Sequence, residues 1–141
     1  MRMLRFIPFL VIPVLVYAAL AITSGGQMTE RMSGQVFALT MASGDVWRMS
    51  FGSLFVSLSV LCLFFEVLRA VRPSNAAIGE NISTALVLIV CIGLFLLARG
   101  FGTSEFFLIV LLLLIDFLTD STVMVFTAKR SVGLGVSNIP G

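Results

Sequence analysis

The chain has 141 residues, of which 59% are hydrophobic and only 11% are charged. A soluble domain has about one-quarter charged residues, and one of this length buries only about two-thirds of its surface. Such a domain has too little interior for this many apolar side chains, so the composition predicts an integral membrane protein. The formal net charge of +2 is too small to indicate a nucleic-acid partner.

Histidine is absent from the sequence, and the two cysteines, Cys62 and Cys91, lie inside apolar runs. The sequence therefore lacks the commonest general base, the commonest metal ligand and the usual axial ligand of b-type haem, and the cysteines are expected to be small buried hydrophobic side chains. We expect no enzyme activity, no metal site and no resident cofactor. The apolar helix surfaces suit bound lipid, quinone or carotenoid equally well.

Four apolar runs organise the chain, at residues 6–22, 51–68, 82–98 and 106–128. Their lengths are close to the roughly 17–25 residues that a helix needs to cross about 30 Å of hydrocarbon. They predict an all-α membrane protein with a single domain over residues 1–130 and four transmembrane helices. The glycine-rich residues 131–141 are expected to form a flexible cytoplasmic tail.

Arginine and lysine residues predict the orientation, because they are retained on the cytoplasmic side during insertion. With the amino terminus inside, six of the nine basic residues become cytoplasmic: Arg2, Arg5, Arg69, Arg72, Lys129 and Arg130. The other three fall outside: Arg31, Arg48 and Arg99. This distribution predicts that both termini lie on the cytoplasmic side.

The outer loop over residues 24–50 is expected to have structure of its own. Residues 36–41 and 46–51 are rich in β-branched, aromatic and other apolar side chains and flank a Gly-Asp turn at residues 42–45, which predicts a short β-hairpin lying on the membrane. Trp47 suits the headgroup level. The alternative is an amphipathic interfacial helix with apolar side chains at helical spacing: Met28, Met32, Val36 and Leu39.

Asp116 and Asp120 lie inside the fourth run and share one helix face, with Thr119 close by. An ionisable side chain in hydrocarbon costs at least about 2.5–3.5 kcal/mol and persists only with compensation. One interpretation is a proton or cation stepping site, because two carboxylates this close favour one shared proton or one bound cation. The other is polar adhesion to a neighbouring helix. We favour adhesion, because the polar groups are concentrated on one span, whereas a transport path recruits several.

The depth of Asp116 in the membrane suggests its partner. A rise of about 1.5 Å per residue places Asp116 and Tyr17 at nearly the same depth, counted from Ala128 and Phe6 at the inner boundary. The Tyr17 hydroxyl is therefore the predicted hydrogen-bond partner of Asp116. On this interpretation Asp116→Asn preserves assembly, whereas Asp116→Leu leaves the partner unsatisfied and weakens assembly by about 1–2 kcal/mol.

Glu66 and Arg69 stand three residues apart at the inner end of the second run, a spacing that lets them pair on a helix surface. We interpret them as an interfacial ion pair whose charged tips reach the headgroups. The alternative is that Glu66 acts as an ion gate.

Ser50, Ser53 and Ser57 recur at helical spacing at the start of the second run. Small side chains let two helix backbones approach closely, so these serines predict a helix-packing surface. They are not expected to be nucleophiles, since no base is present to activate them.

Several short motifs are distributed along the chain after residue 42: Ser43-Gly44, Trp47, residues 64–70, residues 106–108, Ile115-Asp116 and Ala128-Lys129-Arg130. Together they resemble a group of small, uncharacterised inner-membrane proteins of alphaproteobacteria. Those proteins often carry an acidic residue after the glycine equivalent to Gly52, where this chain has Ser53. The resemblance implies a bacterial cytoplasmic membrane and supplies no activity.

The leading functional prediction is a non-catalytic accessory or assembly subunit of a larger inner-membrane complex of respiratory or photosynthetic type. The structured loop, the one-sided polar helix and the serine surface would contact lipids and other integral membrane subunits. A prediction from a different class is a small oligomeric ion- or proton-coupled transporter that uses Asp116 and Asp120. The chain resembles small multidrug transporters in size but lacks their acidic residue in the first span.

Overall fold

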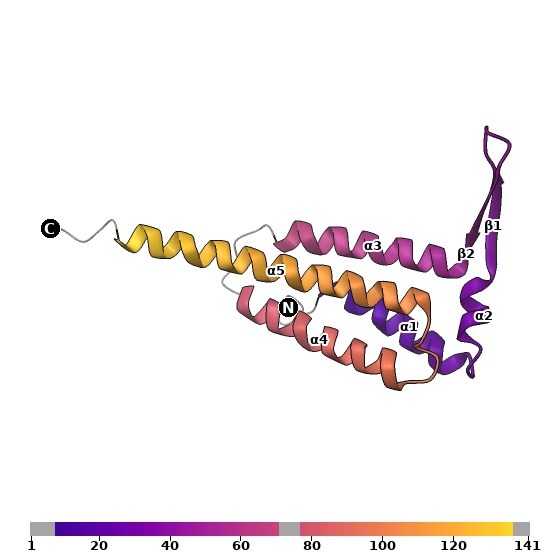
Figure 1. The fold of residues 1–141 in the computed structure, drawn as a ribbon, viewed down its shortest axis with the longest axis horizontal. Coiled ribbons are helices and arrows are strands. Elements are labelled where there is room, and N and C mark those ends of the chain that lie inside the picture. The colour runs from indigo at the N-terminus through magenta and orange to yellow at the C-terminus, as the bar shows by residue number, and fades with distance from the viewer. Residues whose placement is uncertain (1–7, 71–76, 137–141) are drawn as a thin grey trace.

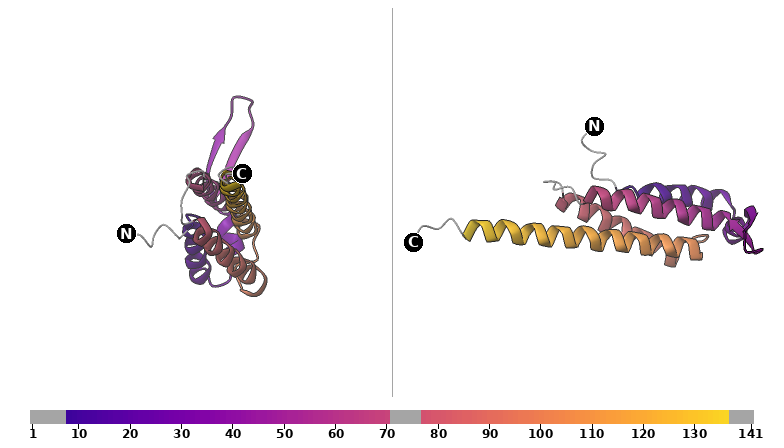
Figure 2. Two further views of the ribbon diagram at one scale, coloured as in Figure 1. Left: turned by 90° about the vertical axis from the view of Figure 1, so that its left-hand side faces the viewer. Right: turned by 90° about the horizontal axis from the view of Figure 1, so that it is seen from above.

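The computed structural model describes residues 8–70 and 77–136, and over these residues the chain is mostly helical with one small sheet (Figure 1). The elements in chain order are α1 (Val11–Thr23), α2 (Met28–Ser33), β1 (Gln35–Thr40), β2 (Val46–Ser50), α3 (Phe51–Ala70), α4 (Ala77–Leu97) and α5 (Ser104–Val136). The four longer helices run along one axis, and α2 and the two strands lie at one end (Figures 1 and 2). We call this end the hairpin end and the opposite one the Arg69 end.

Two helical segments are long and apolar enough to cross a membrane: Phe51–Arg69 within α3 and Ser104–Phe126 within α5. Only 22% of each segment is buried inside the structure, so most of its apolar side chains face outward, unlike those of a core helix in a soluble protein. Two shorter apolar helices, Val11–Thr23 and Asn81–Leu97, accompany them. The prediction of a mainly helical protein is thus confirmed, and the second and fourth apolar runs form helices of a length and composition that suit a membrane span.

Two helix boundaries differ from the sequence prediction. Helix α5 continues to Val136, so residues 131–136 are helical where a flexible tail was predicted; residues 137–141 lie outside the described part. No proline interrupts the run before that point, and a helix does not need to end where the hydrocarbon ends. Helix α1 begins only at Val11, which places Pro13 in the first turn, where its missing N–H has no helical acceptor to lose.

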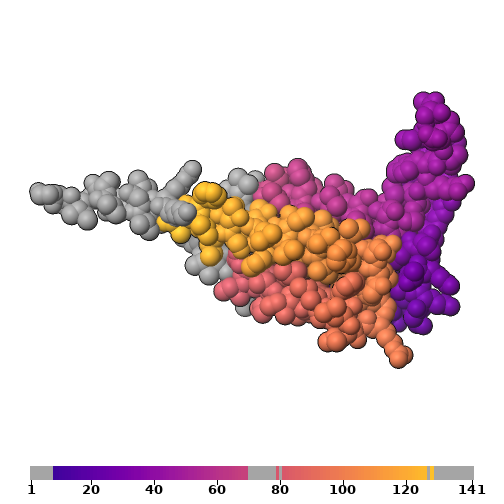
Figure 3. All heavy atoms as spheres, viewed as in Figure 1, coloured from indigo at the N-terminus to yellow at the C-terminus, as the bar shows by residue number. Residues whose placement is uncertain are grey.

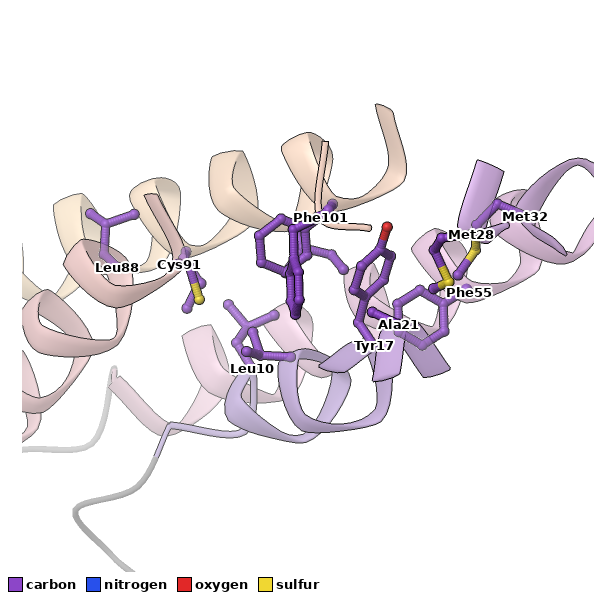
Figure 4. Close-up of a cluster of buried hydrophobic side chains, with 13 residues drawn as sticks. Leu10, Tyr17, Ala21, Met28, Met32, Phe55, Leu88, Cys91 and Phe101 are labelled. Atoms are coloured by element: carbon purple, nitrogen blue, oxygen red, sulfur yellow. The ribbon is translucent and has the colours of Figure 1, made fainter. Parts of the chain in front are cut away.

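Helix α5 is the central element, packing against α3, α4 and α1. Its inward face repeats at alternating three- and four-residue intervals, the spacing of a helix seam. Four side chains on this face are fully buried: Phe106, Ile109, Leu113 and Asp116. The apolar ones belong to a core that runs along the bundle from Leu88 and Cys91 on α4 to Met28 and Met32 on α2 (Figure 4).

Gly52 sets how closely α3 approaches α5. A Cβ atom on Gly52 would lie 2.6 Å from the Glu105 Oε1 atom and 2.7 Å from its Cγ atom. The missing side chain therefore lets the first turn of α3 pack directly against the first turn of α5. Because the two helices both run from the hairpin end to the Arg69 end, this contact also fixes their relative stagger (Figure 1).

The predicted hairpin is confirmed. Strands β1 and β2 pair antiparallel with Leu39 opposite Trp47, and Gly44 occupies the turn with a φ of 90° that favours glycine. The hairpin stands across the bundle axis and projects to one side (Figure 3). The alternative, an interfacial helix, holds only for its first part: α2 buries Met28 and Met32 at 1% exposure, whereas Val36 and Leu39 belong to β1.

Candidate functional site

Asp116 lies on the buried seam of α5, one turn after Leu113. Its side chain is fully buried, and neither carboxylate oxygen has a hydrogen-bond partner among the described residues. Leaving a buried polar group unpaired costs about 1–3 kcal/mol, and more if the group is charged. Asp116 is therefore the buried polar group that packing in this chain leaves least compensated.

Helix α3 presents charge close to Asp116. Leu63 follows Gly52 on α3 by the same number of residues as Asp116 follows Glu105 on α5. Because Gly52 contacts Glu105 and the two helices run in the same direction, Leu63 and Asp116 lie at the same level of the bundle. Glu66 follows one turn further toward the Arg69 end. The charged groups that act electrostatically on Asp116 are Glu66, Arg69 and Asp120.

Helix α4 supplies polar partners that the sequence analysis missed. The Asn81 Nδ2 atom donates to the Ser121 hydroxyl at 2.8 Å, and the Thr84 hydroxyl lies 3.5 Å from the Asp120 carboxylate. The assumption that polar groups are concentrated on one span was therefore wrong. Asn81 and Thr84 are three residues apart and share a face of α4, a pattern that could have indicated them.

On α5 the polar groups around Asp116 continue in one direction only. Toward the Arg69 end, Asp120 and Thr84 form the next level, followed by Ser121 and Asn81. Toward the hairpin end, the same face of α5 carries three fully buried apolar side chains: Phe106, Ile109 and Leu113. We call the polar series from Asn81 to Asp116 the polar lane; within the described residues it ends at this apolar block.

Tyr17 is not the partner of Asp116. Its hydroxyl bonds to the Thr103 hydroxyl and lies 3.2 Å from the Gly100 carbonyl oxygen, at the hairpin end. Thr103 caps α5, since its hydroxyl also accepts the Phe106 N–H at 3.2 Å. The depth estimate failed because α5 extends past Ala128, so counting both helices from assumed inner boundaries misjudged their stagger.

Thr119 does not join the polar lane. Its hydroxyl donates to the Ile115 carbonyl oxygen of its own helix at 2.8 Å, and Thr122 does the same to Leu118 at 2.7 Å. Such local bonds satisfy a hydroxyl in an apolar setting without a partner helix. Of the three polar residues that the sequence placed together on this helix, Asp116 and Asp120 therefore belong to the lane and Thr119 does not.

The ion pair between Glu66 and Arg69 is confirmed, but Glu66 does not reach the surface. It is 3% exposed and accepts the backbone N–H of Phe9, just before α1 begins. The Arg69 guanidinium carbon lies 5.1 Å from the centre of the Phe9 ring, within range of a cation–π contact. The pair thus attaches the start of α1 to α3 from inside the bundle.

The predicted serine packing surface is not used within the described chain. Ser50 caps α3, because its hydroxyl accepts the Ser53 N–H at 3.1 Å. Ser53 and Ser57 are exposed, and Ser57 bonds back to the Ser53 carbonyl oxygen at 2.8 Å. The close approach of α3 to α5 comes from Gly52 instead.

A groove between α1 and α3 has a volume of about 310 Å³ and is almost wholly apolar. Ile12 and Val16 line one side and Leu54 and Leu58 the other. An acyl chain, a quinone tail and a carotenoid all present a hydrocarbon surface that fits such a groove. No three His, Cys, Asp or Glu side chains within residues 8–70 and 77–136 come together as a metal-ligand set.

The hairpin carries the largest concentration of apolar side chains outside the four-helix bundle. Pairing of Leu39 with Trp47 and of Phe37 with Met49 puts these four side chains on one face of the ribbon. The ring centres of Phe37 and Trp47 are 5.5 Å apart, and the rings meet edge to face. The opposite face carries Ala38, Thr40, Val46 and Arg48. We call the first the aromatic face of the hairpin.

Comparison of the chain with family models, with curated proteins and with solved structures gave no match. The features of the chain that bear on its function are therefore the polar lane, the Glu66–Arg69 pair and the aromatic face of the hairpin.

Proposed function

We propose that the chain is a four-span integral protein of a bacterial cytoplasmic membrane that acts as a non-catalytic accessory or assembly subunit, docking through its hairpin onto another membrane protein. The observation that carries this proposal is the aromatic face of the hairpin. Leu39 is 56% exposed and Trp47 43%, although an apolar ribbon of two strands is only marginally stable alone in water. A partner surface would remove this apolar area from water.

Two observations support four spans with this orientation. Helices α1 and α4 run alongside the two candidate spans, and the 21 residues of α4 extend about 31 Å at 1.5 Å per residue, enough to cross the hydrocarbon. Arg31, Arg48 and Arg99 all belong to segments at the hairpin end, whereas Lys129 and Arg130 follow the candidate span of α5 at the other end. The hairpin end is then periplasmic and both termini cytoplasmic.

The position of the hairpin favours docking to a neighbour in the membrane. It extends sideways past α3, so with the bundle along the membrane normal it overhangs the space where an adjacent protein would stand (Figures 1 and 3). The exposed Ser53 and Ser57 lie on α3 just below it and would let a partner helix approach closely. Hairpin and serines together form one continuous candidate interface with another integral subunit.

The transporter alternative is less well supported. A carrier that uses Asp116 and Asp120 needs polar access from both sides of the membrane, whereas the polar lane meets the apolar block of Leu113, Ile109 and Phe106. Crossing that block would require a rearrangement of the bundle for which the described residues provide no second polar path.

Photo-crosslinking in intact bacterial membranes tests the docking proposal. A photoreactive residue at Leu39 is expected to yield one adduct of fixed size with an integral membrane protein, and Leu39→Ser with Trp47→Ser should abolish co-purification of that protein. The matched control is Ala38→Ser with Thr40→Ser, on the opposite face. Crosslinks to lipid alone, or equal loss of the partner in both double variants, would contradict a docking role for the aromatic face.

A further inference from the structure

The unpaired carboxyl of Asp116 points to a ligand, and its surroundings limit what the ligand is. A bound metal cation needs several oxygen ligands arranged around it, and the residues that the structure describes hold no group of three His, Cys, Asp or Glu side chains that could bind one. A proton needs no cavity and no further ligands. It also removes the charge, the most costly part of burying a carboxylate in an apolar seam.

The route for that proton follows from the polar lane. Asp120 lies one turn from Asp116 toward the Arg69 end, with the Thr84 hydroxyl 3.5 Å from its carboxylate. Asn81, one turn from Thr84 on α4, is bonded to Ser121, the residue after Asp120. On α5 the opposite direction is occupied by buried apolar side chains, and the buried Ser59 hydroxyl of α3 donates back to the Phe55 carbonyl oxygen of its own helix at 2.9 Å. Among the described residues, the hydrogen-bonding groups that lead to Asp116 therefore come from the Arg69 end.

Ionisation of Asp116 would place a negative charge in the contact between α3 and α5. The new negative charge would face Glu66 on α3 and Asp120 on its own helix, while the nearest cation, Arg69, is already paired with Glu66. Helix α1 has no charged residue, and the described side chains of α4 include none; the buried titratable groups on these two helices are Tyr17 and Cys91. Like charges in an apolar interior repel strongly, and this repulsion favours separation of the helices or entry of water.

We propose that Asp116 is a proton-binding site in exchange with the cytoplasmic side through Asp120 and Thr84, and that release of its proton loosens α5 from α3 and α4. The site is a one-sided sensor of cytoplasmic proton concentration built into the membrane bundle. The assignment to the cytoplasmic side rests on the proposed orientation of the bundle, whereas the site itself needs no partner protein and does not depend on the docking role of the hairpin.

Infrared spectroscopy of the full chain in proteoliposomes tests the bound proton. The wild type should show the C=O band of a buried protonated carboxylic acid, which is lost as the pH rises. Asp116→Asn should lack this band at every pH, and Asp45→Asn, which changes an exposed turn residue, should retain it. A band that persists in Asp116→Asn would assign the proton to another residue, and a midpoint that moves with sodium concentration would show a bound cation instead.

Two further measurements test loosening and access. The rate of maleimide labelling at the buried Cys91, divided by its rate in Asp116→Asn at the same pH, should rise several-fold over the pH range in which the band disappears. Thr84→Val should slow deuterium exchange of the Asp116 carboxyl several-fold without moving the midpoint. A ratio of Cys91 labelling rates that stays constant with pH would show that ionisation of Asp116 does not loosen the helices. An unchanged rate of deuterium exchange in Thr84→Val would refute access through the polar lane.

Discussion

The hairpin end and the Arg69 end of the bundle differ in how completely their buried polar groups are hydrogen-bonded. At the hairpin end, the Tyr17 and Thr103 hydroxyls bond to each other, to the Gly100 carbonyl and to the Phe106 N–H, so the connection between α1 and α5 is internally satisfied. Toward the Arg69 end, Glu66 is buried but paired, and Asp116 is buried with no hydrogen-bond partner among the described residues. A closed network gives a rigid junction, whereas an open one can respond to a ligand.

Glu66→Ala is expected to have the largest effect on stability. It removes the acceptor of the Phe9 N–H and the carboxylate that pairs with the Arg69 guanidinium, and breaking a buried ion pair from one side costs about 3 kcal/mol. Reversible unfolding in mixed detergent micelles measures the loss. The control is Glu30→Ala in α2, which is exposed and should change the free energy of unfolding by less than about 0.5 kcal/mol.

Asp116→Leu is expected to stabilise the bundle, by about 1–3 kcal/mol in the same assay. The sequence predicted weaker assembly through an unsatisfied partner, but the described residues provide no such partner. Replacing an unpaired buried polar group with an apolar one of similar volume removes its desolvation cost. Asp116→Asn keeps a polar group in place and should lie near the wild type. Destabilisation by Leu would mean that Asp116 has a binding partner that packing within this chain does not provide.

Tyr17→Phe should cost about 1 kcal/mol, the net value of a typical buried hydrogen bond. The ring contacts with Phe55, Phe101 and Phe106 remain, so the loss isolates the hydroxyl. Unlike Asp116→Asn, this variant should leave the pH dependence of Cys91 labelling unchanged. A changed pH dependence would mean that the two ends are coupled and would weaken the distinction between them.

Ser50→Ala should have the smallest effect, a loss of about 0.5–1 kcal/mol from removal of a helix cap. Ser57→Ala is the matched control, because the Ser57 hydroxyl bonds only back into its own helix in the described structure. Hydrogen exchange at the first amides of α3 would detect the fraying that loss of the cap causes. Equal effects of the two substitutions would show that Ser50 stabilises the helix start no more than a serine inside the helix does.

The sequence alone determined the features that depend on short-range spacing. Alternating apolar residues around Gly44 predicted the hairpin, because strand pattern and turn chemistry are local. The Glu66–Arg69 pair followed from its three-residue separation on one helix. The apolar runs predicted the helices, since composition and length decide whether a segment suits hydrocarbon.

Only the tertiary structure decided which polar groups meet between helices. Tyr17 bonds to Thr103 and not to Asp116, and Asn81 and Thr84 of α4 join the polar lane, because the stagger and rotation of the helices place them there. Stagger depends on packing contacts far apart in sequence, such as Gly52 against Glu105, which no periodicity within one helix encodes. For the same reason, the sequence located Asp116 within its helix, and only the packed bundle left both of its carboxylate oxygens unpaired.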